Sequence, residues 1–474
     1  MTGAGAGVPA FRAAQSVTSA INRAAGGRPI PGNQVTLLID GPCAYDAMTD
    51  VIAAATRWIH FENYIIRPDA AGRRFADALA ARAREGVAVR VLYDALGCFG
   101  TPRSFWRALR GAGVDVRPFR PLSPLDLVPN LSRNHRKLVV ADGARAVMGG
   151  LCIGCEWTGE ASEDGHAWRD TAVEIAGPAA AVLDQAFART WSIAGGTLPD
   201  EHVARRVTPQ GQAEVRVIGG EPGHERTYRV IELLAAGAID RLWITDAYLV
   251  APPRLFQALG DAARDGVDVR LLVPGSSDLP LVRNLSRIGY RQLLRSGVRI
   301  FEWDGPMLHA KTSVADGRWT RVGSSNLNAS SLVGNYELDV LIEDVELGDA
   351  MERQFRLDVA RSREVIRRPA RGPQRISAAL PAVLRREDPE IAPSAHHPTA
   401  RERRRRAALA LRALISSARR SIFLPLSVIL ISLGALFFAL PKLTAYAFGV
   451  LCGWLALSAW REAFRRRGRT GEKA

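Results

Sequence analysis

The chain has 474 residues, of which 47% are hydrophobic, so it can bury a large core and has the length of about two to four domains. Its net charge is +15, but residues 401–474 hold 15 Lys and Arg against 3 Glu, which leaves only +3 for residues 1–400. A body this close to neutral argues against nucleic-acid binding, where basic residues line one face of the domain itself. Five cysteines, an odd number, do not suggest a disulfide framework.

The N-terminal segment, residues 1–30, is small, polar and aperiodic. It lacks the apolar core of a secretory signal, so a flexible segment is expected there.

The body that follows contains an internal repeat. Residues 84–92 read REGVAVRVL, and residues 264–272 read RDGVDVRLL, 180 positions later. In both copies a helical pattern ends at a glycine and enters an apolar strand, which is how a helix stop and a buried strand look. The helical patterns cover 70–85 and 253–265, and strand patterns at 59–66 and 242–250 precede them. This alternation predicts an α/β fold with two similar halves, residues 31–200 and 213–365.

The placement of lysine is the most informative feature. The chain has four lysines against 59 arginines, and two of the four stand in the same pattern. The patterns are His135-x-Lys137-x4-Asp142-x6-Gly149 and His309-x-Lys311-x4-Asp316-x6-Gly323. Composition alone gives one such match roughly three times in ten thousand, so two matches, one per repeat, are not chance.

The residue types in this pattern suit phosphate chemistry. In an extended strand His135 and Lys137 point the same way, as do His309 and Lys311. The ammonium is a compact charge for a phosphate oxygen, and the imidazole can attack phosphorus or protonate a leaving oxygen. The alternative, two histidines packed for structural reasons, is disfavoured by the duplication.

These are the HKD motifs of the phospholipase D superfamily, which the chain resembles over about residues 33–365. The layout is similar to that of the bacterial cardiolipin synthases. Further segments carry the resemblance: Asp94–Gly97, Arg133–Lys137, Trp168–Asp170, Gly323–Asn326 and Asn335–Glu337. The resemblance implies two α/β halves packed so that both motifs meet in one pocket near a pseudo-twofold axis.

The resemblance also implies a mechanism. One histidine attacks phosphorus to give a phosphohistidine, and the other protonates the departing alcohol and then activates the incoming one. We favour His135 as nucleophile and His309 as acid/base, and the pseudo-symmetry leaves the reverse open. Lys137, Lys311 and Asn326 are implied to hold the phosphate oxygens.

Family placement assigns the orientation of the histidines to two carboxylates, Asp170 and Glu337. The motif residues Asp142 and Asp316 are expected to stabilise the motif loops rather than to touch substrate.

The first half departs from the family pattern at one position. An Asn normally falls seventeen residues after the motif histidine, as Asn326 does, but the first half has Cys152 there. A thiol is a poorer hydrogen-bond donor than an amide, so one phosphate contact is in doubt. Cys152 and Cys155 form a C-x-x-C, a pattern found in redox-active pairs and in half zinc sites, but no second pair completes four zinc ligands. No metal and no cofactor are predicted.

The C-terminal region reads differently from the body. Residues 366–400 are a proline-rich linker, 401–420 a basic segment, and 421–460 two apolar runs near the ~20 residues needed to cross a bilayer. Basic flanks, including the tail 461–474, predict a transmembrane hairpin with both ends and the catalytic body on the cytoplasmic side of the cell membrane. A buried helical hairpin and a shallow interfacial hairpin are the alternatives.

The resemblance implies phospholipid substrates. The leading hypothesis is cardiolipin synthesis from two phosphatidylglycerols. The enzyme is expected to associate with the membrane, and no nucleic-acid partner is expected. Its rivals are hydrolytic phospholipase D activity and other headgroup exchange. A nuclease and a non-catalytic lipid-binding scaffold are further alternatives.

Overall fold

The computed structural model describes residues 17–121, 132–158, 167–204 and 206–366, together with Gly453, Trp454 and Leu457. The predicted linker, basic segments and transmembrane hairpin (366–474) therefore lie almost wholly outside the described residues. Within the described part of the chain, no helix combines the length and the apolar character needed to span a membrane. All elements discussed below lie in residues 17–366.

A single sheet of fifteen strands runs through both halves, in the order β15-β11-β10-β9-β12-β13-β14-β8-β1-β7-β6-β5-β2-β3-β4. The first half contributes β1 (Ile30–Ile39), β2 (Trp58–Asn63), β3 (Ala88–Asp94), β4 (Asp115–Phe119), β5 (Leu138–Ala141), β6 (Arg145–Gly149) and β7 (Thr171–Ala176). The second contributes β8 (Ala213–Gly220), β9 (Arg241–Thr245), β10 (Asp268–Pro274), β11 (Arg299–Trp303), β12 (Thr312–Ala315), β13 (Trp319–Gly323), β14 (Glu337–Glu343) and β15 (Ser362–Glu364). Read outward from the centre, both halves have the same strand order, which confirms the predicted α/β fold of two similar halves.

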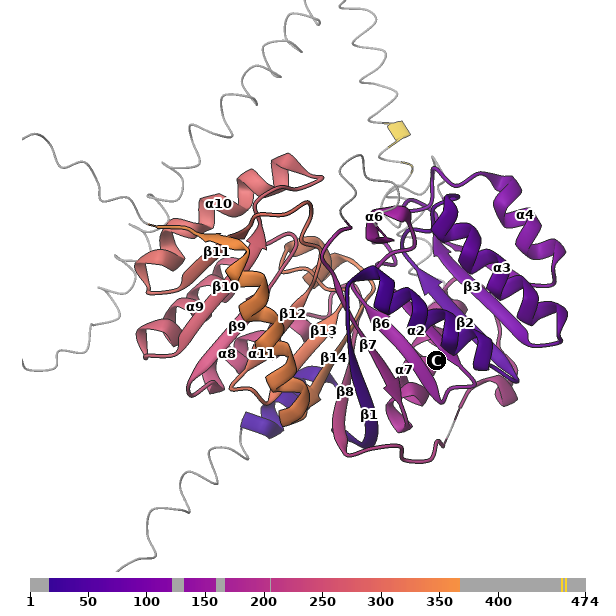
Figure 1. Cartoon of the computed structure of the whole chain (residues 1–474), viewed down its shortest axis with the longest axis horizontal. Helices are drawn as coiled ribbons and strands as arrows, with labels where there is room; N and C mark the ends of the chain where they lie inside the picture. Colours follow the sequence, from indigo (N-terminus) through magenta and orange to yellow (C-terminus); the bar gives the residue numbers. More distant parts are fainter. Residues whose placement is uncertain are drawn as a thin grey trace, which may run out of the picture. The chain divides into compact units, whose positions relative to one another are not determined.

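The halves are joined through their central strands (Figure 1). β1 pairs antiparallel with β7 of its own half and antiparallel with β8 of the other, with Ile30 opposite Val215 and Asn33 opposite Ala213. The two halves are thus parts of one continuous sheet. Near the outer edges, β2, β3 and β4 are parallel, as are β9, β10 and β11.

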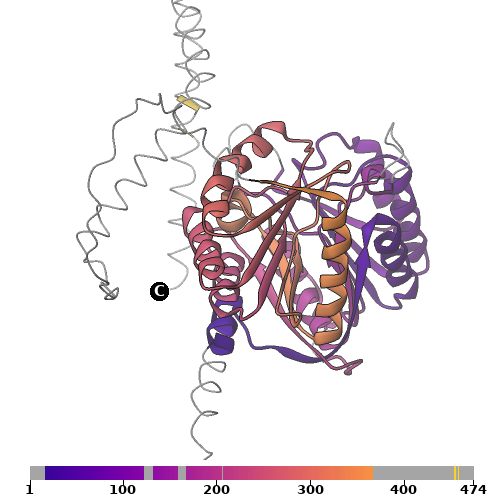
Figure 2. The ribbon, with the colours of Figure 1, turned by 60° about the vertical axis from the view of Figure 1, so that its left-hand side comes forward.

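Helices cover the sheet in three buried apolar clusters. The helices are α2 (Asp40–Ala54), α3 (Ala70–Arg84), α4 (Arg103–Gly111), α6 (Cys155–Thr158), α7 (Pro178–Ile193), α8 (Arg226–Gly237), α9 (Pro253–Arg264), α10 (Pro280–Arg295) and α11 (Val345–Ala360). α2, α3 and α4 cover the first half, and α8, α9 and α10 cover the second. The third cluster unites α7 and α11 with strands of both halves, and Figure 2 shows α11 lying along the sheet. This shared core holds the halves in a fixed relation.

The repeated sequence forms the expected elements. α3 and α9 occupy the two helical patterns, and each ends before a glycine in the left-handed region, Gly86 at φ 91° and Gly266 at φ 99°. This conformation is the usual reason for a glycine just after a helix. The chain then enters β3 or β10.

The expectation of a flexible segment over residues 1–30 is wrong in part, because residues 17–25 form a helix. Ile21, Ala24 and Ala25 are buried in the core of the second half, and Arg216 Nε donates to Asn22 Oδ1 over 2.7 Å. The apolar positions are mostly alanine, which gave too weak a hydrophobic pattern to be recognised in the sequence.

Candidate active site

Both motif histidines line one cavity of about 580 Å3 between the halves. His135 lies just before β5, and His309 lies in the equivalent place before β12. The expectation that each His-x-Lys segment lies in a strand is therefore slightly wrong, since the regular strands begin at Leu138 and Thr312.

The motif segments are held by short backbone bridges between the halves. His135 N–H donates to Tyr336 O over 2.9 Å, and His309 N–H donates to Arg169 O over 2.7 Å. Each motif is therefore held in part by the opposite half.

The orienting carboxylates are exchanged in the same way. His135 Nδ1 lies 3.0 Å from Glu337 Oε2 of the second half, and also 3.1 Å from the carbonyl oxygen of Ser324. His309 Nδ1 lies 2.7 Å from Asp170 Oδ2 of the first half. Acceptors on Nδ1 fix the tautomer that carries its proton there, which leaves the Nε2 lone pair available. Each motif histidine is therefore paired with a carboxylate of the opposite half.

Burial keeps both imidazoles uncharged at neutral pH. Burial lowers the pKa of His135, and burial together with the charge of Lys311 lowers the pKa of His309 to about 4. Burial alone raises the pKa of Asp170. In acid solution, where this carboxyl titrates, His309 is protonated, and its charge and hydrogen bond lower the pKa of Asp170 to about 2. The site therefore combines ionised carboxylates with neutral histidines.

Each motif lysine is buried beside its own motif histidine. Lys137 is 2% exposed and Lys311 is fully buried, and each Nζ donates to the backbone carbonyl of its own motif histidine. Burial lowers the pKa of Lys137, and it lowers the pKa of Lys311 to about 8. The charges of both lysines act on both motif histidines, so an anion bound beside the imidazoles would be stabilised by two ammonium groups.

We expect kcat/KM to fall as pH rises through about 8. Lys311 carries its proton below this pKa and loses the charge above it, so phosphate binding weakens on the alkaline side. The histidines and Asp170 titrate well below this range, and the pKa of Tyr64, at about 12, lies above it. Measurement of kcat/KM between pH 6 and about 9.5 tests for this alkaline decrease. A flat profile would contradict the assignment of Lys311 to the phosphate.

Asn326 and Cys152 both line the cavity at equivalent places in the two halves. Asn326 Oδ1 is buried and has no hydrogen-bond partner among the described residues, so the amide has bonding capacity left for a ligand. Burial raises the pKa of the Cys152 thiol, against the charges of Lys137 and Lys311, so it is a neutral group in the site.

Aromatic side chains that the motifs did not predict surround the two histidines. The Tyr64 ring lies 4.9 Å from the His135 ring, and Lys137 Nζ lies 5.1 Å from the same tyrosine. Trp157 and Tyr248 lie 5.5 and 6.0 Å from the His309 ring, and Trp157 Nε1 donates to Asp170 over 2.9 Å. Both tyrosines follow the last residues of equivalent strands, β2 and β9, and that shared position was the available signal.

A buried ion pair anchors the first motif. Arg133 bonds Asp94 through Nε and Nη2 at 2.9–3.1 Å, and Asp94 also accepts from the Asn134 N–H. Asp94 ends β3, so the repeated strand fixes the start of the motif. Removing one partner of such a pair leaves an uncompensated buried charge.

Asp142 and Asp316 lie away from the cavity and bind backbone. Asp142 accepts from the N–H groups of Thr56, Arg57 and Trp58, at 2.8–2.9 Å. Asp316 accepts from the equivalent segment, residues 239–241, at 2.9 Å. Both have positive φ, 53° and 52°, in the turns after β5 and β12. Each side chain ties its motif hairpin to the start of β2 or β9.

Asp142→Ala and Asp316→Ala should therefore lower stability and spare turnover. Three backbone N–H groups lose their acceptor in each variant, which costs about 1–3 kcal/mol. Thermal unfolding should show a lower midpoint, and active-site titration of the folded protein should show nearly unchanged kcat. A large loss of kcat in fully folded protein would instead place these carboxylates in the chemistry.

Comparison with known proteins supports the geometry. The family model described as cardiolipin synthase, PLD-like domain, matches residues 48–191 and 230–359. The chain is 33% identical over 349 residues to cardiolipin synthase A of Pseudomonas entomophila, covering 73% of each chain. It is 35% identical over 338 residues to cardiolipin synthase A of Pseudomonas aeruginosa, covering 71% of this chain and 69% of the relative.

A solved structure shares the fold. The phosphatidylserine synthase of Haemophilus influenzae superposes with a TM-score of 0.57 at 15% identity, covering 74% of this chain and 92% of that one. The family match over both halves and the two relatives above 30% identity decide the classification. The chain belongs to the cardiolipin synthase family of phospholipase D-like phosphatidyltransferases.

Proposed function

We propose that this enzyme makes cardiolipin by transferring a phosphatidyl group from one phosphatidylglycerol to the glycerol hydroxyl of a second, with release of glycerol. The observation that carries the proposal is the pair of carboxylate-held histidines that line one cavity, each followed two residues later by a buried lysine. One histidine can bond to phosphorus while the other handles the proton of each alcohol.

The lining of the cavity suits a phospholipid. Polar side chains line part of it, including Asn326, Asn328 and Asn335. Aliphatic side chains line the rest: Ile65, Val250, Leu279, Val282 and Leu285. A headgroup phosphate beside apolar glycerol esters and acyl chains matches this division.

In the proposed reaction, His135 Nε2 attacks the phosphorus of the first phosphatidylglycerol. The phosphorus–oxygen bond to glycerol breaks, and His309 donates a proton to the departing oxygen. The second phosphatidylglycerol then gives a hydroxyl proton to His309 and attacks the phosphohistidine, which releases His135. Lys137, Lys311 and Asn326 bind the phosphate oxygens, and Glu337 and Asp170 hold the two rings.

Substrate binding prepares His309 for its acid role. Burial and the charges of Lys311 and Lys137 together lower the pKa of His309. An anionic phosphate between these groups offsets those charges and raises that pKa, and Asp170 stabilises the imidazolium that results. The ionisation therefore follows the arrival of the phosphodiester.

The C-terminal region is proposed to hold the enzyme at the membrane. Its two apolar runs within 421–460, flanked by arginine clusters, support a hairpin with the catalytic body on the cytoplasmic side.

The test is incubation of the full-length protein with phosphatidylglycerol vesicles, with mass-spectrometric analysis of the lipids and of free glycerol. Cardiolipin and glycerol in equal amounts are expected. Phosphatidic acid without cardiolipin would show that water is the acceptor and would overturn the proposal. If cardiolipin forms only after a different phospholipid is added to the vesicles, that phospholipid and not phosphatidylglycerol is the donor.

A further inference from the structure

Two pseudo-equivalent helices, α4 and α10, are strongly basic. α4 follows β3 in the first half, and α10 follows β10 in the second. α4 contains three arginines and α10 contains four, of which Arg287 is ion-paired with Glu302 at 2.8 Å, and neither helix contains an acidic residue. The first 400 residues carry a net charge of only +3, so these helices concentrate positive charge.

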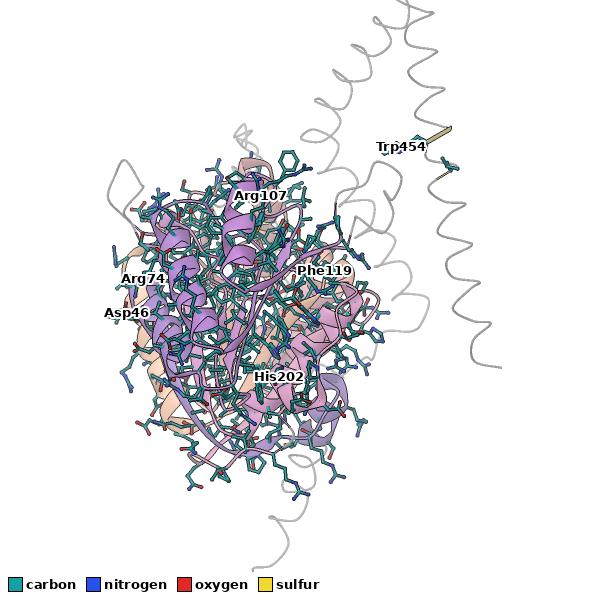
Figure 3. All side chains as sticks on the ribbon, turned by 90° about the vertical axis from the view of Figure 1, so that its right-hand side faces the viewer. Asp46, Arg74, Arg107, Phe119, His202 and Trp454 are labelled. Carbon is teal, nitrogen blue, oxygen red and sulfur yellow. The ribbon has the colours of Figure 1, made fainter. Side chains whose placement is uncertain are left out.

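The arginines of α4 face solvent. Arg103, Arg107 and Arg110 are exposed and follow helical spacing, and within the described residues Arg103 and Arg107 pair with no acidic side chain. With Tyr93 and Trp106, whose rings stack at 3.9 Å, they line a cavity of about 530 Å3. Figure 3 shows Arg107 at the upper edge of the body. Guanidinium groups at an aromatic wall fit a phosphate headgroup.

Large apolar side chains are exposed next to both helices. Before α4, Leu96 is 46% exposed and Phe99 is 77% exposed. Next to and within α10, Leu279 is 48% and Ile288 is 37% exposed. Exposed aromatic and aliphatic groups beside arginines are typical of a surface that inserts shallowly into a membrane interface.

These residues lie at the same end of the strands as the mouth of the active site. β2 and β3 are parallel, so their carboxyl ends lie together. Tyr64, which follows β2, therefore lies close to the segment 95–101, which follows β3. Cys98 Sγ confirms the contact by accepting from the Ile66 N–H at 3.2 Å. In the second half, Val282 and Leu285 of α10 themselves line the active-site cavity.

The two helices flank that mouth. Figure 1 shows α10 and α4 along the same edge, with α6 between them, and Trp157 of α6 lines the cavity. A flat anionic surface that touched both helices would therefore cover the entrance.

We propose that α4, α10 and the exposed side chains Leu96, Phe99, Leu279 and Ile288 form a docking face for an anionic phospholipid bilayer, which presents the active site to lipid in the plane of the membrane. This inference rests on the proposed function in taking its substrate from a bilayer. The docking face acts separately from the C-terminal region, because every residue of it lies in the catalytic body.

Binding is tested without turnover. The full-length His309→Ala protein is mixed with vesicles of phosphatidylcholine alone or with phosphatidylserine, and amide hydrogen exchange is followed by mass spectrometry. Slower exchange in segments 95–101 and 276–288 is expected only with phosphatidylserine, and it should disappear in high salt. Equal exchange in both segments with the two vesicle types would overturn the docking face.

Turnover is tested with matched charge changes. Arg103→Gln with Arg107→Gln should lower the initial rate on phosphatidylglycerol vesicles about tenfold and leave the rate on monomeric short-chain phosphatidylglycerol unchanged. The control is Arg23→Gln with Arg57→Gln, which removes two exposed arginines, one in the N-terminal helix and one before β2, at the strand end away from the cavity.

The outcomes separate the two proposals. Equal rates for both double variants on vesicles, or an equal loss on monomeric lipid, would overturn the docking face while cardiolipin synthesis stands. A different pair of results would uphold the docking face and reject the proposed function. In that case phosphatidylserine vesicles slow hydrogen exchange in His309→Ala, but the wild-type protein makes no cardiolipin.

Discussion

Replacing either motif histidine by alanine should lower kcat/KM for cardiolipin formation by at least about 10^4, because the covalent intermediate or its proton transfer is lost. The two variants should differ with a lipid analogue whose leaving group is nitrophenolate, which needs no protonation to depart. His309→Ala should then accumulate a phosphatidyl adduct on His135, and His135→Ala should form none. Peptide mass spectrometry after a rapid quench identifies the modified residue.

A matched control for this experiment lies elsewhere in the first half. His60 is fully buried, and its Nδ1 lies 2.7 Å from Asp184 Oδ1, the same distance as in the His309–Asp170 pair. It faces α7, with its ring stacked on Phe187, and has no lysine two residues later. His60→Gln should therefore lower stability without preventing adduct formation. An adduct on His309 in the His135→Ala protein would reverse the assignment of the two roles.

Much of the architecture could be predicted because the sequence repeats. A strand, a helix and a His-x-Lys segment recur in both halves, so one half predicts the other. Local patterns of this kind depend on neighbours in the chain. The pairing of β1 with β8 joins strands that are about 180 residues apart in the chain. The hydrophobic periodicity of each segment does not show which distant strand it pairs with. The N-terminal helix was missed for a related reason, since its alanines gain their burial only from the second half.

The second large effect should come from the positioning residues. Glu337→Gln and Asp170→Asn should each lower kcat about 10^2- to 10^4-fold, because an amide nitrogen facing Nδ1 favours the wrong tautomer. The exchange between halves makes the effects distinct. Glu337→Gln should slow formation of the adduct on His135, and Asp170→Asn should slow its breakdown.

Rapid-quench measurement of the adduct separates these steps. With the nitrophenyl analogue, Asp170→Asn should show a normal burst followed by slow turnover, and Glu337→Gln should show no burst. Asp184→Asn is a suitable control, since Asp184 holds His60 Nδ1 at 2.7 Å and bonds neither motif histidine. A normal burst in Glu337→Gln would show that the contact across the halves does not orient the nucleophile.

This exchange is the part of the site that sequence reasoning could not reach. The identities of Asp170 and Glu337 came from their positions after each motif, and those positions do not say which histidine each carboxylate holds. Ser324 is a second example. Its carbonyl oxygen lies 3.1 Å from His135 Nδ1, and its hydroxyl donates to Glu337 over 2.5 Å. A backbone acceptor has no residue signature.

The central place of β1 has a consequence for synthesis of the chain. During translation, the first half emerges before β8 is made, so one side of β1 has no partner in its own chain during that time. An open strand edge on a nascent chain invites pairing with a neighbouring polypeptide. Pro31 and Gly32, together with the register shift between Ile30 and Asn33, lie in the part of β1 that later meets β8. Proline cannot donate to an incoming strand, so this edge is protected until its own partner is translated.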